Sequence, residues 1–178
     1  FATADQSIAE PAQVLRQSKS FRSASYVSAR NPDGKSSSWT RVLVSHEPQV
    51  NESDQNTALT LPICINGELS VAGEKDTFAI QGQAGKTFRF FGRTRSLGSF
   101  ARLKMLLANA DGSIVAQSPV NDSDEWSFDY QFPDDGEYQL TATDLINRGG
   151  DCFGYHIEIS KPTPFHLALK PDAKSREQ

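Results

Sequence analysis

Hydrophobic and polar residues alternate with a period of two through much of the chain, in short stretches separated by turn signals. From Leu61 onward, turn residues such as Gly, Asp, Asn and Pro recur about every 8 to 12 residues. Side chains of a β-strand point alternately to the two faces of a sheet, so each stretch has one apolar face to bury. The clearest alternations are Phe78 with Ile80, Phe88 with Phe90, Leu103 with Met105 and Leu107, Trp126 with Phe128 and Tyr130, and Tyr155 with Ile157 and Ile159.

The connections between these stretches predict the architecture. Parallel neighbours need a crossover of about a dozen residues or more, and most of the turns are shorter than that. The sequence therefore predicts an all-β protein, an antiparallel two-sheet β-sandwich of jelly-roll type with about eight strands. The aromatic stripes are expected to pack in its core and not to form a ligand platform.

The region before the sandwich has a different composition. Residues 1–24 are predicted to form a polar segment, with one short helix around residues 11–18. Residues 25–49 read as a β-hairpin extension around the turn at residues 31–34. The sandwich is expected to span residues 50–160.

The ends of the chain suggest a piece of a longer polypeptide. The chain begins with Phe1, and its opening residues show no export signal. Residues 161–178 are expected to extend toward a next module, because Phe165, Leu167 and Leu169 alternate as in a strand. A frayed tail is the alternative interpretation.

Composition and charge narrow the classes of function. The chain has 178 residues, 18 Lys and Arg against 22 Asp and Glu, and a formal net charge of −4. It lacks the basic excess of a nucleic-acid-binding protein, so DNA and RNA are not expected as partners. Charged or polar residues interrupt every apolar run, so no membrane-spanning helix is expected.

An ordered series of short signals runs through residues 50–160: proline and NG, a G-x-x-D-x-F strand, AG, LGS, DG, P-x-DGEY and a closing Y-x-I-x-I strand. This series resembles the bacterial pre-peptidase C-terminal domain. The residues that carry the resemblance are Pro62, Asn66, Gly67, Gly73, Asp76, Phe78, Ala84, Gly85, Leu97, Gly98, Ser99, Asp111, Gly112, Pro133, Asp135, Gly136, Tyr138, Asp144, Gly149, Gly150 and Tyr155.

The resemblance implies a non-catalytic β-sandwich module of an exported bacterial protein, similar in fold to the collagen-binding modules of clostridial collagenases. Such modules often stand beside peptidase domains. The flanks look like those of multi-domain surface proteins of planctomycete-type bacteria, in which residues 25–49 would end a preceding immunoglobulin-like module. A secreted, periplasmic or cell-surface location follows, with neighbouring domains of the same polypeptide as the first partners.

Acidic residues near the first strands suggest a calcium site. Calcium takes six to eight oxygen ligands, and loops at one end of a sandwich can supply them. Similar collagenase modules bind calcium through an acidic linker and a loop aspartate, although the linker sequence NESDQNT departs from their usual run. The alternative is that these side chains cap turns. The expected ligands are Glu52, Asp54, Asn56, Glu74 and Asp76.

Two cysteines, Cys64 in the first core strand and Cys152 just before the last, are candidates for a disulfide. The first and last strands of a jelly roll are often neighbours, which makes this pairing plausible. Two reduced thiols are the alternative interpretation. The chain has no C-x-x-C motif, so a zinc site or a redox dithiol is not expected.

A basic group on adjacent strands and their loop is a candidate ligand-binding surface. It suits a sulfated glycan or an acidic protein, while a solvated strand face is the alternative. Its predicted binding residues are Arg89, Arg93, Arg95 and Arg102, with Lys104 nearby.

Catalysis has little support in the sequence. The three histidines stand in unrelated contexts, and neither a G-x-S-x-G nor an H-E-x-x-H motif is present. A glycosidase-like carboxylate pair among residues 122–125 and 134–137 is the remote alternative. We therefore expect a non-enzymatic module that binds or positions an extracellular protein or polysaccharide. The rival hypothesis is a structural spacer without a ligand.

Overall fold

The computed structural model describes residues 13–15, 24–29, 34–38, 40–43, 45, 47–54, 57–119 and 125–162. The chain divides into two compact units, Phe1–His46 and Glu47–Gln178.

The first unit contains a small antiparallel sheet in the order β1-β2-β3. Its strands are β1 (Gln13–Leu15), β2 (Ala24–Ser28) and β3 (Thr40–Leu43). The helix expected around residues 11–18 is wrong, because β1 pairs with β2 in the register Val14 to Val27. A weak local helix preference yields here to the backbone hydrogen bonds of a neighbouring strand.

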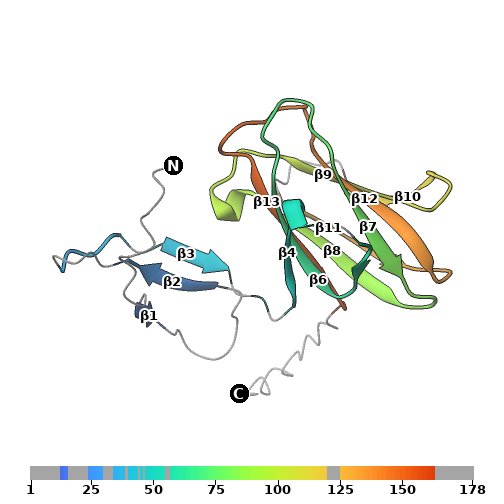
Figure 1. The fold of residues 1–178 in the computed structure, drawn as a ribbon, viewed down its shortest axis with the longest axis horizontal. Helices are drawn as coiled ribbons and strands as arrows, with labels where there is room; N and C mark the ends of the chain where they lie inside the picture. The colour runs from blue at the N-terminus through green and yellow to red at the C-terminus, as the bar shows by residue number, and fades with distance from the viewer. Residues whose placement is uncertain are drawn as a thin grey trace, which may run out of the picture. The chain divides into compact units, whose positions relative to one another are not determined.

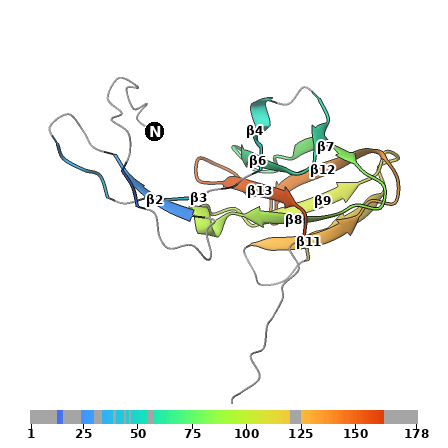
Figure 2. The same ribbon diagram turned by 90° about the horizontal axis from the view of Figure 1, so that it is seen from below.

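The second unit is a β-sandwich of two five-stranded sheets, which confirms the predicted fold class (Figures 1 and 2). The first sheet has the order β10 (Ile114–Gln117), β9 (Leu103–Ala108), β12 (Gly136–Asp144), β7 (Asp76–Gly82) and β5 (Leu59–Thr60). The second sheet has the order β11 (Trp126–Gln131), β8 (Thr87–Arg93), β13 (Gly154–Ser160), β6 (Ile63–Glu68) and β4 (Gln49–Asn51).

The edges of the sandwich correct two details of the prediction. The two sheets hold ten strands, where about eight were expected, because β4 and β5 add short edge strands. Both of these strands pair in parallel, β4 with β6 and β5 with β7. Residues 52–62 supply the crossover between β4 and β6 that short turns would not allow. All other pairs in the two sheets are antiparallel.

The core lies between the two sheets and is rich in aromatic rings. Phe90 stacks on Phe128 with 4.8 Å between the ring centroids, and Phe132 packs edge-to-face against Tyr130 and Tyr138 at 5.1 and 4.7 Å. Burial of each large side chain contributes roughly 1.5–3 kcal/mol to folding. Within the sandwich, the aromatic stripes are core packing, as expected.

Helical structure in the described residues is confined to two 3-10 turns, η2 (Glu52–Asp54) and η3 (Arg95–Leu97). None of the helices found there has the length and hydrophobicity needed to cross a bilayer.

Candidate functional site

Several loops meet at one end of the sandwich, which we call the loop end (Figure 1). The antiparallel order brings the last residues of β6, β8 and β12 beside the first residues of β7, β9 and β13. The loop end therefore consists of η2 and residues 69–75, 94–102 and 145–153. Backbone hydrogen bonds join these loops, from Gly150 to Leu69, from Gly73 to Asn147, from Phe100 to Cys152 and from Leu145 to Arg102.

Two of the predicted calcium ligands, Glu52 and Asp76, lie side by side at the loop end. Tyr155 Oη donates a hydrogen bond to Asp76 Oδ2 at 2.6 Å, with a longer contact of 3.4 Å to Glu52 Oε2. Glu52 Oε2 also accepts a hydrogen bond from the Glu68 N–H at 2.8 Å. Burial raises the pKa of both carboxyls, and the negative charge of Asp76 raises the pKa of Glu52 further.

The other three predicted ligands are not added to this pair. Glu74 Oε2 accepts a hydrogen bond from the Val71 N–H at 2.9 Å and so closes its own turn. Asp54 lies in η2, where its side chain is not described, and Asn56 lies outside the described residues. Where the chain is described, no three His, Cys, Asp or Glu side chains form a group that would hold a metal ion. The calcium site stays a prediction that rests on two carboxylates.

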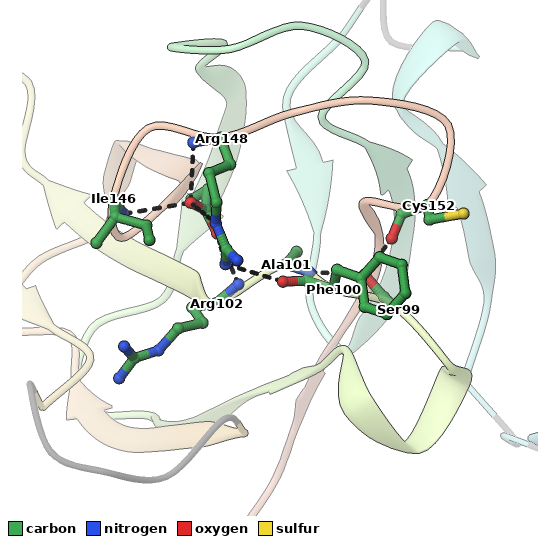
Figure 3. A network of polar contacts seen from close by, with 8 residues as sticks. Ser99, Phe100, Ala101, Arg102, Ile146, Arg148 and Cys152 are labelled. Carbon is green, nitrogen blue, oxygen red and sulfur yellow. Dashed lines mark hydrogen bonds and ion pairs between the residues drawn. The ribbon is translucent and has the colours of Figure 1, made fainter.

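The buried carboxylate of Asp144 ties the loops of this end together. Figure 3 shows its partners Arg102, Ile146 and Arg148. The Asp144 side chain is 0% exposed and pairs with Arg148, which also donates to Phe100 O at 2.9 Å. Burial alone would raise the pKa of Asp144, but the hydrogen bonds it accepts lower that pKa below its ordinary value. Asp144 accepts hydrogen bonds from the backbone N–H groups of Arg102, Ile146 and Arg148 at 2.7, 3.2 and 2.9 Å, and from Arg148 Nε and Nη2 at 3.1 and 3.0 Å.

The predicted basic group divides between two parts of the sandwich. Arg89 and Arg93 alternate on β8 and point to the outer face of the second sheet. Arg95 belongs to η3, and Arg102 precedes β9, so both lie at the loop end. The structure therefore does not assemble one surface from the four arginines.

Ion pairs neutralise the two arginines of the outer face. Arg89 Nε lies 2.7 Å from Asp129 Oδ1, and its hydrogen bond lowers the pKa of Asp129. Arg93 Nη2 lies 3.6 Å from Glu158 Oε2, and its Cζ lies 4.3 Å from the centre of the Phe91 ring. This balance does not favour a sulfated ligand, which needs unpaired positive charge.

Toward β4, the same outer face carries the imidazole of His156 and the amides of Asn66 and Gln49. The sequence did not predict this group. His156 Nδ1 donates to Asn66 Oδ1 at 2.8 Å, and Asn66 Nδ2 donates to Gln49 Oε1 at 3.1 Å. Burial lowers the pKa of His156, and the charge of Arg93 lowers it further. Alternation in β6 and β13 predicts that His156 and Asn66 point to the same kind of face. Only the register between the strands brings them together.

The predicted disulfide is absent from the structure, for a topological reason. Cys64 is buried, whereas Cys152 is exposed in the loop before β13. Strands β6 and β13 are neighbours as expected, but their register places Cys64 opposite Glu158. Glu158 lies four residues, about 13 Å, after the start of β13, and Cys152 lies before that start. A disulfide requires Cα atoms within about 7 Å.

Among the carboxylates considered for a glycosidase, Asp122 and Asp124 lie outside the described residues, and Glu125 and Asp135 lie apart. Glu125 stands at the loop end, where its Oε1 accepts hydrogen bonds from the Thr94 and Ser96 N–H groups. Asp135 stands beyond the other end of β11, where its Oδ1 accepts a hydrogen bond from the Ala84 N–H at 2.7 Å. The six residues of β11 separate these turns by about 20 Å, so they do not form a catalytic pair.

The chain is similar in fold to several solved structures. No family model and no curated protein matches the chain. The pre-peptidase C-terminal domain of a collagenase from Bacillus anthracis is 13% identical at a TM-score of 0.47, over 66% of this chain and 99% of that one. The domain in this similar structure is the one that the sequence resembles.

Two further similar structures come from the Clostridium perfringens protein ZmpB. One holds its CBM51-2 in complex with GlcNAc and INT domains; it is 13% identical, with a TM-score of 0.37 over 84% of this chain and 40% of that one. The other holds its catalytic domain with CBM51-1 and CBM51-2; it is 14% identical, with a TM-score of 0.37 over 85% and 20%. The present chain therefore spans less than half of either structure.

Proposed function

We propose that the sandwich is a non-enzymatic binding module of a secreted or surface-attached multi-domain protein, and that it binds a neutral polysaccharide. The outer face of the second sheet is the proposed binding surface. The observation that carries this proposal is that its polar side chains are fixed in three bonded groups: Asp129 with Arg89, Arg93 with Glu158, and Asn66 with Gln49 and the buried His156.

These side chains are held in place before any ligand arrives. A group fixed by its neighbours loses little conformational entropy on binding, so its hydrogen bonds add more to affinity. Arginine carries five N–H donors and a carboxylate about four acceptor sites, which leaves capacity for ligand hydroxyls after each ion pair has formed. The two ion pairs cancel in charge, which favours a neutral, hydroxyl-rich polymer over an anionic one.

The contrast with the other outer face supports this choice of surface. The outward residues of β7 are Thr77, Ala79 and Gln81, and those of β12 include Gln139 and Thr141. Among the described residues, no ion pair is found between side chains of this face. It offers fewer fixed hydrogen-bonding groups and serves as the matched control surface.

The test is retention of the chain by soluble polysaccharides in native affinity gels, followed by calorimetry with any glycan that retains it. We expect Arg89→Ala and Gln49→Ala together to weaken binding about tenfold or more, a loss of about 1.4 kcal/mol. The matched pair Thr77→Ala and Gln139→Ala should bind as the wild type does. Heparin should not bind better than a neutral glycan, because the arginines are paired.

The spacer hypothesis makes the opposite prediction. A spacer folds cooperatively but is retained by none of the glycans, and its variants do not differ in retention. Equal weakening by both variant pairs would exclude this face as the binding surface.

Calcium is a second candidate ligand, favoured by the close approach of Glu52 and Asp76. A divalent cation between two carboxylates would remove their repulsion, and hard oxygen ligands suit calcium. The residues fit a calcium ion only in part, since two carboxylates are fewer than the usual ligand set. We expect calcium to raise the melting temperature over that in chelator and Glu52→Gln to abolish the rise. Glu137→Gln, on the exposed side of β12, is the control. Equal melting temperatures with calcium and with chelator would exclude calcium binding at this site.

A further inference from the structure

Strand β11 is the long, regular edge of the sandwich. It has six residues, and its register with β8 runs without interruption from Trp126 opposite Gly92 to Gln131 opposite Thr87. The other three edge strands are blunted, as is common in natural sheets. Strand β5 has two residues, β4 has three, and β10 has four with a register shift.

The backbone of β11 has unused hydrogen-bonding groups along its free edge. Phe132 N–H donates to Lys86 O, which continues the β11–β8 ladder by one bonded pair. Bonded and non-bonded pairs alternate in an antiparallel ladder, so the N–H and C=O groups of Ser127, Asp129 and Gln131 point away from β8. In the described part of the chain, no strand lies on that side of β11.

The side chains of β11 leave this edge without the usual protection. The strand contains neither proline nor lysine, and the charge of Asp129 is paired with Arg89. On the core side, Phe128 and Tyr130 are only partly buried. An added strand would therefore cover apolar surface as well as pair with backbone groups.

We propose that the free edge of β11 accepts residues 165–169 of the same chain as an added antiparallel strand. These residues lie outside the described part of the chain, and their sequence alternates Phe165, Leu167 and Leu169 with His166 and Ala168. The apolar residues would pack beside Phe128 and Tyr130. The intervening side chains, with Lys170 after them, would share the outer face with Asp129, whose charge is already paired with Arg89.

The direction and reach of the chain agree with this pairing. Strands β13 and β11 are both antiparallel to β8, so a chain that turns back after Ser160 runs antiparallel to β11. The free edge lies three strand spacings from β13, about 14 Å. The five peptide units from Ser160 to Phe165 extend up to about 17 Å, which is sufficient.

Amide hydrogen exchange in the full chain tests the proposal. We expect the amides of Ser127 and Asp129 to be protected, and Leu167→Asp to accelerate their exchange about tenfold or more. Ala168→Asp is the matched control, because it places the same charge on the outward side of the added strand. Its exchange rates should stay within about twofold of the wild type.

A second pair of variants tests the same contact by changing Ser127 on β11. Ser127→Pro removes an outward N–H while sparing the ladder with β8, and Ser127→Thr keeps that N–H. Chymotrypsin should cleave between Phe165 and Leu169 about tenfold faster in Ser127→Pro than in Ser127→Thr. If Ser127→Pro does not fold, the Leu167 and Ala168 pair still decides the question.

Three results would overturn the proposal. The first is exchange at Ser127 and Asp129 that Leu167→Asp leaves unchanged, and the second is equal acceleration by Leu167→Asp and Ala168→Asp. The third is protection that grows with protein concentration, because an added strand from the same chain does not depend on concentration. None of these readouts uses a glycan, so they are independent of the proposed function.

Discussion

The hydroxyl of Tyr155 on β13 donates a 2.6 Å hydrogen bond to the carboxylate of Asp76 at the start of β7. One hydrogen bond thus joins the two sheets of the sandwich at the loop end. Burial raises the pKa of Tyr155, and the hydrogen bond to Asp76 raises it further. The phenol therefore remains a donor, and Asp76 and Glu52 compete for it.

This competition predicts a pH dependence of stability. The folded chain has raised carboxyl pKa values at Glu52 and Asp76, so it holds their protons to higher pH than the unfolded chain does. The free energy of unfolding should therefore fall as the pH rises from the ordinary carboxyl pKa, about 4, through the raised values. Below this interval both states are protonated and the penalty is absent.

The Glu52→Gln variant isolates this effect. It removes one of the two charges, so we expect a higher melting temperature than the wild type near pH 7 and a weaker dependence on pH. Thermal melts between about pH 4 and pH 8 in chelator measure the difference. Glu137→Gln serves as the control, and a Glu52→Gln curve parallel to the wild type at every pH would contradict the prediction.

Crowding around Gly67 makes a second prediction. Gly67 lies opposite Tyr155 in the β6–β13 ladder, and a Cβ atom at Gly67 would overlap Tyr155 Oη and Glu52 Oε2. The Tyr155 ring is buried and has no room to move aside. We expect Gly67→Ala to destabilise the fold by about 1–3 kcal/mol in urea unfolding.

Gly154 is the matched control for that substitution, because it stands in the same ladder with open space. A Cβ atom at Gly154 would meet its nearest neighbour, Gly67 O, at 3.7 Å. Gly154→Ala should change stability by about 0.5 kcal/mol or less. Equal effects at the two glycines would show that Tyr155 does not occupy this space.

The buried carboxylate of Asp144 makes a third prediction. Asp144→Asn leaves Arg148 and three backbone N–H groups with a weaker acceptor, and breaking such a pair costs roughly 3 kcal/mol. The pKa of Asp144 is lowered, so its contribution is present above the ordinary aspartate pKa and is lost as the pH falls below it. Chemical unfolding at neutral and acidic pH measures both effects.

Asp129 provides the comparison for Asp144. Its pair with Arg89 is solvent-exposed, with side-chain exposures of 42% and 38%, so Asp129→Asn should cost about 1 kcal/mol or less. A larger loss for Asp129→Asn than for Asp144→Asn would refute the assignment of Asp144 as the anchor of the loops.

The cysteines make a fourth prediction, which follows from their burial. A water-soluble thiol reagent should label Cys152 in the folded chain within minutes and reach Cys64 only after unfolding, because Cys64 is 0% exposed. Mass spectrometry of digested peptides identifies the labelled residue. A chain that takes no label when unfolded without reductant would instead contain the disulfide.

Much of the sandwich was predictable because its information is local. Alternation in β7, β8, β9, β12 and β13 specifies which side of each strand is buried, and turn residues mark where each strand ends. Strands β4 and β5 were missed because two or three residues carry no readable period. Their parallel pairing depends on a crossover that only the assembled sheets bring into place.

The candidate sites were predictable by residue type but not by partner. From the sequence one can tell that Glu52, Asp76, Arg89 and Arg93 are polar groups at turns or on outward strand faces. Their partners are visible only in the folded chain, where Asp76 meets Tyr155, Arg89 meets Asp129, and β6 and β13 are adjacent while Cys64 and Cys152 stay apart. The reason is physical: alternation depends on neighbouring residues, whereas register between strands is set by packing and hydrogen bonds between distant parts of the chain.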